Sequence, residues 1–315
     1  MGATMYVNYL QRFHGLPVVT FPGQAPANAL PAAGSVAWRL STGDEAEEEY
    51  WERFAGTVKL HDVRALIFSD SWYSANCNWP EGPVELLVEH RSQLTSLQAV
   101  FLGDVVAQVD RGISWLHQTD VTPILRAYPH LQELGVRGGL GLAFPVMRHE
   151  DLRVLRLESD GLPPEAVEGV IAADLPALEF LEMWLGNNCN LGHTTVEHLA
   201  PLLTEGRFRA LRHLGLQNSP IQDEIAAAVA SAPLVAQLTS LSLSMGTLSD
   251  SGALSLLAGQ PLTHLEELDL HHHYLSDAVM LKIREALAPA GVRINLTGQK
   301  EPYYFDGERD DSIAV

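Results

Sequence analysis

The feature that most constrains this chain is an apolar pattern, L-x-x-L-x-L, that returns along most of its 315 residues. The clean copies are Leu97/Val100/Leu102, Leu131/Leu134/Val136, Leu152/Leu155/Leu157, Leu178/Leu181/Met183, Leu211/Leu214/Leu216, Leu238/Leu241/Leu243 and Leu265/Leu268/Leu270. Val63/Leu66/Phe68 and the degenerate Ser35/Trp38/Leu40 precede them, and Ile294/Leu296 ends the series. The first positions are separated by 28, 34, 34, 21, 26, 33, 27 and 27 residues. A period of this size predicts a fold of stacked repeats.

Each repeat combines a strand with a helix. The apolar period is two within the pattern and about 3.6 in the segments that follow it. Helices are predicted in the segments 163–175, 193–206, 223–234, 249–259 and 276–288. Helices are about 10 Å wide and parallel strands lie about 4.8 Å apart, so equal numbers of each bend the array with the strands inside. The sequence therefore predicts an α/β horseshoe solenoid with roughly nine or ten parallel strands on its concave face and helices on its convex face.

These repeats resemble the long, helix-containing repeats of the leucine-rich-repeat superfamily, in particular its ribonuclease-inhibitor-like members. The stretch TLSDSGALSLLAGQPLTHLEELDLHHHYLSDAVMLKIREAL carries the resemblance, which covers roughly residues 63–296. ISWLHQTDVTPILRAYPHLQELGVRGG, at Ile113 to Gly139, resembles an uncharacterised family of bacterial cytoplasmic leucine-rich-repeat proteins. That second resemblance implies no established activity.

The sequence departs from the usual repeat at the ninth position, where asparagine is common. The residues found there are Ser71, Val105, Gly139, Asp160, Gly186, Ser219, Gly246 and His273. We therefore expect other groups to satisfy the backbone where each strand ends.

Three regions are predicted: an N-terminal cap over 1–62, leucine-rich repeats over 63–298 and a C-terminal acidic tail over 299–315. A solenoid needs a cap because its first repeat would otherwise expose apolar side chains. GDEAEEEYWERFAG is the expected cap helix. Its carboxylates fit a solvated first helical turn, with an acidic docking site as the alternative.

Charge and cysteine content limit the partners. With 20 Lys and Arg against 39 Asp and Glu, the net charge of −19 disfavours nucleic acid and anionic membrane surfaces. Cys77 and Cys189 lie far apart and outside any zinc-binding spacing, so no structural metal is expected. The sequence carries no export signal or long apolar run, which predicts a cytoplasmic protein.

Motifs for catalysis are lacking. The sequence contains no GxSxG, P-loop or HExxH motif, and RGGLGLAF lacks the third glycine of a phosphate-binding loop. In the triplet at 271–273, only His271 shares a strand face with Asp269, and two ligands are too few for a divalent metal. We therefore predict no catalytic residue, metal or cofactor.

The strand positions that face away from the helices define a predicted binding surface. Near the middle of the series they combine arginine, glutamate and tryptophan, residue types that supply much of the energy of protein interfaces. This set comprises Arg137, Arg156, Glu158, Glu182 and Trp184. The alternative is that an arginine stacks on Trp184 without any partner.

Long loops after three adjacent strands give a second predicted surface, the N-terminal loop rim. Aromatic and charged residues gather in these loops: Trp72, Tyr73, Trp79, Asp104, Trp115, His117, Asp120 and Arg137. Among them we predict Trp72, Tyr73, Trp115 and His117 as partner-binding residues. The competing interpretations are that Trp79 and Trp115 fill gaps in the core and that Asp120 caps a helix near Thr122.

The sequence thus predicts a non-enzymatic recognition scaffold that binds a protein partner by its concave face and N-terminal loop rim. The alternative is a small-ligand or catalytic pocket at the rim, formed by Trp72, Trp115, His117 and Arg137.

Overall fold

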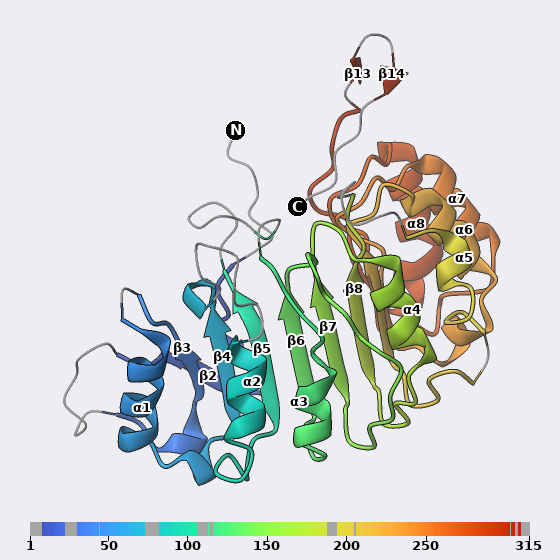
Figure 1. Cartoon of the computed structure of the whole chain (residues 1–315). Coiled ribbons are helices and arrows are strands. Elements are labelled where there is room, and N and C mark those ends of the chain that lie inside the picture. Colours follow the sequence, from blue (N-terminus) through green and yellow to red (C-terminus); the bar gives the residue numbers. More distant parts are fainter. Residues whose placement is uncertain are drawn as a thin grey trace.

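The computed structural model has an α/β fold with an open sheet of 12 strands, ordered β1 to β12 as in the chain (Figure 1). It describes residues 8–22, 30–43, 45–72, 82–105, 113, 116–187, 194–204, 206–302, 304–305 and 308–309. β1 pairs antiparallel with β2, and the pairs from β2 to β12 are parallel. The sheet strands are β1 (Arg12–Phe13), β2 (Leu16–Thr20), β3 (Ala37–Leu40), β4 (Ala65–Ser69), β5 (Ala99–Asp104), β6 (Glu133–Arg137), β7 (Val154–Glu158), β8 (Phe180–Trp184), β9 (His213–Gln217), β10 (Ser240–Ser242), β11 (Glu267–Asp269) and β12 (Arg293–Asn295).

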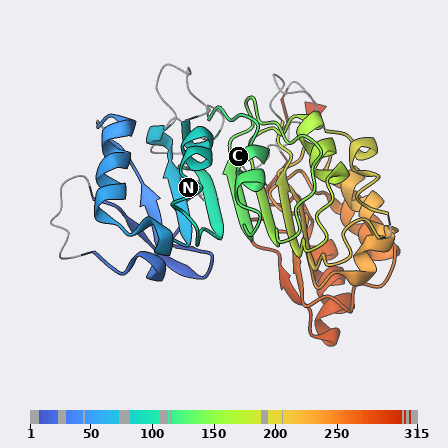
Figure 2. The ribbon, with the colours of Figure 1, turned by 60° about the horizontal axis from the view of Figure 1, so that its bottom comes forward.

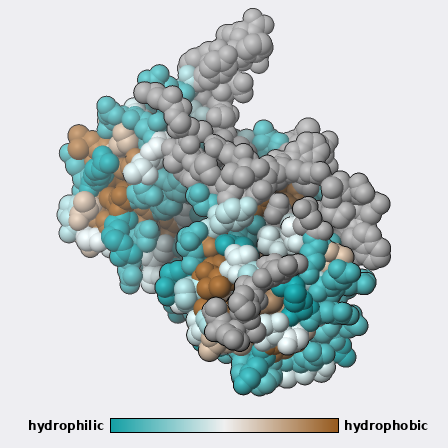
Figure 3. All heavy atoms as spheres, turned by 90° about the vertical axis from the view of Figure 1, so that its left-hand side faces the viewer, coloured by the Kyte–Doolittle hydropathy of each residue, from teal (hydrophilic) through white to brown (hydrophobic). Residues whose placement is uncertain are grey.

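Eight α-helices in the described part of the chain cover one face of the sheet (Figure 2). They are α1 (Glu47–Thr57), α2 (Gly82–Glu89), α3 (Thr122–Ala127), α4 (Pro164–Ala172), α5 (Val196–Leu199), α6 (Gln222–Ala230), α7 (Asp250–Ala258) and α8 (Asp277–Leu287). The five helices that the sequence predicts after residue 160 are all present, although α5 is a single turn. Viewed from the α1 end, the described surface is largely hydrophilic with a few separate hydrophobic areas (Figure 3).

One continuous core fills the space between sheet and helices. The pattern residues point into it: Leu134, Leu155, Leu181, Leu214 and Leu241 are all fully buried. Their register partners align across neighbouring strands, for example Leu214 with Leu181 and with Leu241. The predicted burial and register of the pattern are therefore confirmed.

The backbone N–H and C=O groups at the strand ends are hydrogen-bonded without asparagine at the ninth position. Residues in the left-handed region recur where strands end, and they comprise Gly103, Gly138, Gly186, Asn218, Met245, His272 and Gly298. At these turns the backbone ladder continues, since the Gly186 N–H donates to the Asn218 carbonyl and the Met245 N–H to the His271 carbonyl, both at 2.8 Å.

Aspartates near the helix starts link neighbouring repeats. Asp223 accepts from the backbone N–H of Ser249 at 2.7 Å, and Asp250 accepts from that of Ser276 at 2.7 Å. These residues follow the 27-residue period, so each bond is repeated in the next unit. The carboxylates satisfy backbone N–H groups at the helix starts, which have no partner within the helix itself.

The sheet begins earlier in the chain than the sequence predicts. Residues 12–20 add β1 and β2 before the degenerate copy at 35–40, which itself forms β3. The expected cap helix is present as α1, whose Tyr50, Trp51 and Phe54 join the main core. At the other end, the segment 299–300 bonds to the last repeat, and β13 (Tyr304–Phe305) pairs with β14 (Glu308–Arg309) in a separate hairpin (Figure 1). Among the described helices, none is long and apolar enough to span a membrane.

Candidate functional site

The sheet face opposite the helices, which we call the helix-free face, has two chemically different halves. Over β3 to β5 its residues are mostly small or apolar and buried: Ala37, Ala65, Ile67, Ala99 and Phe101. Over β7 to β12 most of the same register positions are polar: Arg156, Glu182, His213, Ser240, Ser242, Glu267, Asp269, Arg293 and Asn295. We call this second set the polar strip.

The β1–β2 hairpin covers the apolar half. Its turn, at His14 (φ 49°) and Gly15 (φ 70°), places Phe13 against the sheet. Phe13 is 4% exposed and meets the Phe101 ring edge-on with a centroid distance of 5.9 Å. Leu10, Leu16 and Val18 pack against the same cluster, so the hairpin forms a second, smaller core. The sequence signal was present, because Ile67 and Phe101 occupy positions that would otherwise face water.

Buried ion pairs fasten the hairpin and fix the predicted Arg137. Asp104, which is fully buried, accepts from Arg39 Nε at 2.7 Å and from the Leu10 backbone N–H at 3.2 Å. Arg137 Nη1 lies 3.5 Å from Asp104, and Arg137 Nε donates to Glu158 at 2.8 Å. Arg137 is 3% exposed, so this guanidinium is a structural ion-pair partner and does not face solvent as an anchor.

A second ion-pair chain runs from the hairpin into the polar strip. His14 Nδ1 lies 3.2 Å from Glu133, Arg156 bonds to the other Glu133 oxygen, and Arg156 Nε lies 3.6 Å from Glu182. Burial opposes ionisation of Glu133, but the hydrogen bond from His14 and the positive charge of Arg156 outweigh it and lower the Glu133 pKa. The Arg156 guanidinium also lies 4.4 Å from the centroid of the Phe180 ring.

Trp184 is a buried residue, contrary to the expectation of an exposed anchor. Its exposed fraction is 6%, and its indole Nε1 donates to Glu182 at 3.4 Å. Burial, followed by the nearby charge of Glu158, raises the pKa of Glu182. Glu158 is itself buried against Arg137. Of the five residues predicted for this surface, Arg156 and Glu182 keep partial exposure, while Arg137, Glu158 and Trp184 do not.

His213 lies at the centre of the polar strip. Its ring stacks on Phe180 with a centroid distance of 3.9 Å, and its Nδ1 lies 2.9 Å from Ser240 Oγ. Burial, with a smaller contribution from Arg156, lowers the His213 pKa to about 4. The imidazole is therefore neutral near pH 7, and its buried Nε2 has no hydrogen-bond partner among the described groups.

Polar side chains bond to one another farther along the strip. Gln217 Nε2 donates to Ser242 Oγ at 2.7 Å, and Ser242 Oγ lies 2.9 Å from Ser244 Oγ and 3.3 Å from Asp269. Asp269 lies 2.9 Å from His271 Nδ1. His273, by contrast, is fully buried, accepts from the Leu275 backbone N–H and contacts the Leu296 carbonyl. In the part of the chain that the structure describes, no three His, Cys, Asp or Glu side chains converge as metal ligands.

The described rim residues have separate structural roles. Trp72 is 1% exposed and donates from Nε1 to the Leu40 carbonyl at 3.0 Å, so it belongs to the main core. His117 is half-buried and pairs with Leu140 through the backbone. Asp120 accepts from the Thr122 backbone N–H at 2.9 Å at the start of α3, although the N-cap residue of this helix is Val121 and not Asp120. Tyr73, Trp79 and Trp115 lie outside the described residues.

The Ser240–His213 contact brings a hydroxyl to an imidazole, but a serine nucleophile also needs an acid on the other ring nitrogen. His213 Nε2 has no such acid among the described residues. The strip presents a row of hydrogen-bonding groups, most of them half-buried, on one face of the sheet.

The fold and this face define an open α/β protein whose strands and helices stack in chain order, which is consistent with a repeat solenoid. The chain is similar to a crystal structure of a Bacteroides fragilis protein solved as a Northeast Structural Genomics Consortium target, with 25% identity and a TM-score of 0.75. That match covers 85% of this chain and 76% of the other. No protein-family model matches this chain, and no curated protein matches it.

Proposed function

We propose that the chain is a ribonuclease-inhibitor-like leucine-rich-repeat horseshoe and a non-enzymatic scaffold that binds a protein partner. The partner contacts the polar strip on the concave face and the adjoining loop rim. The observation that carries this proposal is the division of the helix-free face. One half is closed by the chain's own hairpin, and the other presents polar side chains without a covering element among the described residues.

The polar strip consists of charged and hydrogen-bonding side chains, as do protein interfaces that retain bound water. Glu267 and Arg293 pair at 3.0 Å with side chains 44% and 68% exposed, and such pairs exchange partners at little cost. Arg156, Phe180 and His213 form a rigid stacked centre, which loses little conformational entropy on binding. Two cavities formed by described residues, of about 520 and 620 Å³, are lined by residues outside this strip. The strip itself has the open form of a protein interface.

The test uses a photo-crosslinking amino acid at Glu267 on the strip and at Glu224, exposed on α6, as the matched control. We expect a partner in native extract to crosslink through position 267 and not through position 224. With that partner purified, Glu267→Arg should weaken binding by about tenfold or more, whereas Glu224→Arg should leave it within about twofold. Equal crosslinking from both positions, or equal losses in the two variants, would refute the proposal.

A further inference from the structure

The helical layer has a gap between α3 and α4. The connection from β6 to β7, residues 138–153, contains no helix and is described throughout. An extended segment takes the place of the helix. It pairs with the chain before α3 through Leu140–His117 and Ala143–Asp120, and with the chain after α4 through Arg148–Asp174. Figure 1 shows α3 and α4 standing apart at this point.

The extended segment lies flat against α4, and a glycine makes this possible. A Cβ on Gly169 would lie 1.8 Å from the Phe144 carbonyl oxygen, so no other residue allows this approach. Leu142 and Phe144 point into the core and are buried. Because an extended chain is thinner than a helix of about 10 Å, the surface is hollowed here.

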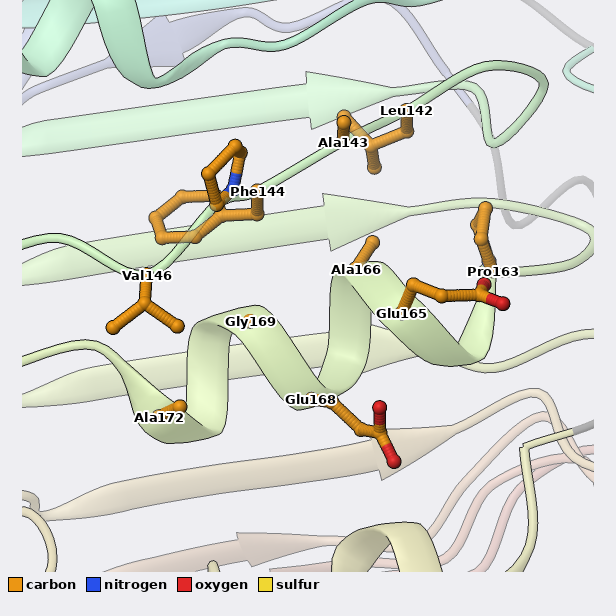
Figure 4. A pocket seen from close by; sticks show the side chains of 11 residues that line it. Leu142, Ala143, Phe144, Val146, Pro163, Glu165, Ala166, Glu168, Gly169 and Ala172 are labelled. Carbon is orange, nitrogen blue, oxygen red and sulfur yellow. The ribbon is translucent and has the colours of Figure 1, made fainter.

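The hollow is a groove of about 520 Å³ between residues 142–146 and the outer side of α4. Figure 4 shows its two walls, with Ala143 near the Ala166 end of α4 and Val146 near the Ala172 end. Val146 is 64% exposed, the largest fraction among the exposed large hydrophobic side chains in the described chain. Val146 and the exposed Ala172 therefore present apolar surface to water, and a partner can bury this surface.

Acidic side chains border the apolar floor. Glu165 and Glu168 lie one turn apart on the outer side of α4, both exposed. Two cations lie near this end of α4. Arg148 is held by Glu150 at 2.5 Å and by Asp174 at 2.6 Å, so its charge is compensated, and Arg207 donates to the Ile171 and Ala173 carbonyls at the C-terminal end of the helix. Glu168 lies 4.0 Å from His198, a contact too long for a strong pair. The groove therefore combines an apolar floor with net negative charge.

We infer that this groove binds one amphipathic helix of a partner protein, with aliphatic residues on its inner side and lysine or arginine beside Glu165 and Glu168. A helix fits because neighbouring helices pack about 8–10 Å apart, and this position in the layer holds only an extended chain. Ala172 on α4 is small and exposed, which allows close approach. The basic flank follows from charge complementarity, and the chain's net charge of −19 disfavours a second copy as occupant.

The probe is a fluorescent synthetic peptide of about 18 residues, with leucine at helical i, i+3, i+4 and i+7 positions and lysine elsewhere. A second peptide replaces each lysine by glutamate. We expect the lysine peptide to bind the full chain at physiological salt and to shift the methyl signals of Val146 and Ala172 in NMR spectra. The glutamate peptide should bind about tenfold or more weakly.

Matched variants separate the groove from general charge. Val146→Glu should weaken binding about tenfold or more, while Leu254→Glu, at an exposed leucine on α7, should change it less than about twofold. Glu165→Lys with Glu168→Lys should likewise weaken it more than Glu224→Lys with Glu285→Lys, which carry the same charge change. Equal losses in the paired variants, methyl shifts elsewhere, or no binding at about 100 μM peptide would overturn the inference. Sedimentation velocity showing a dimer that Val146→Glu abolishes would instead identify a second copy as the occupant and also overturn it.

Discussion

At the scale of single residues, strand-end turns decide whether repeats can stack. Gly186 adopts φ 68°, and a Cβ there would lie 1.9 Å from the Asp160 carbonyl carbon. Asn218 takes the equivalent left-handed conformation at φ 56° in the next repeat, where an asparagine side chain is tolerated. The two turns differ in the space around the α-carbon, so their tolerance of side chains differs.

Gly186→Ala should therefore lower the free energy of unfolding by about 2–4 kcal/mol, through backbone strain and the steric overlap together. The control is Gly206→Ala, which has φ 81° but no heavy atom within 4 Å of the added carbon. It should cost about 1 kcal/mol, the conformational contribution alone. Urea unfolding monitored by circular dichroism gives both values, and equal losses would show that the close approach to Asp160 carries no energy.

His213 gives the fold a pH dependence of predictable sign. Its pKa falls from the ordinary 6.5 to about 4 in the folded chain because the ring is buried. Between these values the unfolded chain binds a proton and the folded chain does not, so stability falls as the pH drops from 6.5 towards 4. His273, whose pKa burial also lowers, contributes in the same direction.

We expect His213→Gln to reduce, but not abolish, the slope of stability against pH in this window. Urea unfolding at several pH values between 7 and 4 measures it. Glu133, with its lowered pKa, loses its contribution as the pH falls below 4.5, and Glu182, with its raised pKa, acts in the opposite direction. Both carboxyl groups are present in the wild type and in the variant, so the difference between the two slopes reports on His213. An unchanged slope in the variant would show that the neutral ring is not favoured by folding.

Trp184→Ala should destabilise the chain, because the indole is 6% exposed. Truncating a buried tryptophan costs about 3–5 kcal/mol, which is comparable with the loss expected for Leu241→Ala in the main core. Thermal unfolding of the two variants tests this. A wild-type melting temperature for Trp184→Ala would contradict its burial and restore it as an exposed anchor.

The pattern leucines, Trp184 and Arg137 show which features of the fold the sequence can predict and which it cannot. The pattern leucines were correctly placed because their spacing alone fixes which side of a strand they occupy. Trp184 and Arg137 were placed on the right strands, but their exposure depends on what packs over the sheet, and the repeat carries no information about that. The hairpin that covers part of the face comes from residues 8–20, outside the repeat.

At the scale of elements, the β1–β2 hairpin is the main departure from a simple stack of repeats. It contributes apolar contacts through Phe13 and polar contacts through Leu10 and His14, and these join it to β3, β5 and β6. The hairpin is thus part of the folded unit, and removing its apolar anchor exposes the second core as well as the hairpin itself.

Phe13→Ala should lower the free energy of unfolding by about 2–4 kcal/mol, since the side chain leaves a cavity against Phe101. Limited proteolysis should then cut within residues 10–20 faster than in the wild type. Val18→Ala, at a half-buried position on the same hairpin, should show a smaller effect on both. Unchanged cleavage in Phe13→Ala would mean that the ion pairs alone hold the hairpin down.

At the scale of the whole molecule, strand order equals chain order, and each strand from β2 to β11 pairs only with its sequence neighbours. Energy is therefore shared mainly between adjacent units, and stability approximates a sum over units and their interfaces. Unfolding of the strands at one end of the sheet need not spread to the other end, because β3 and β11 are far apart and are coupled only through the strands between them.

Leu268→Ala in β11 should therefore reduce hydrogen-exchange protection in β10, β11, β12, α7 and α8 more than elsewhere. Leu66→Ala in β4 should do the reverse, loosening β3 to β5 and leaving β11 close to wild type. Both leucines are fully buried, so each substitution costs about 2–5 kcal/mol, and the total loss is matched while its location differs. Mass spectrometry of exchanged peptides from the full chain resolves the two patterns. An even loss of protection along the chain in both variants would show that the 12 strands unfold as one cooperative unit and that nearest-neighbour coupling does not govern this fold.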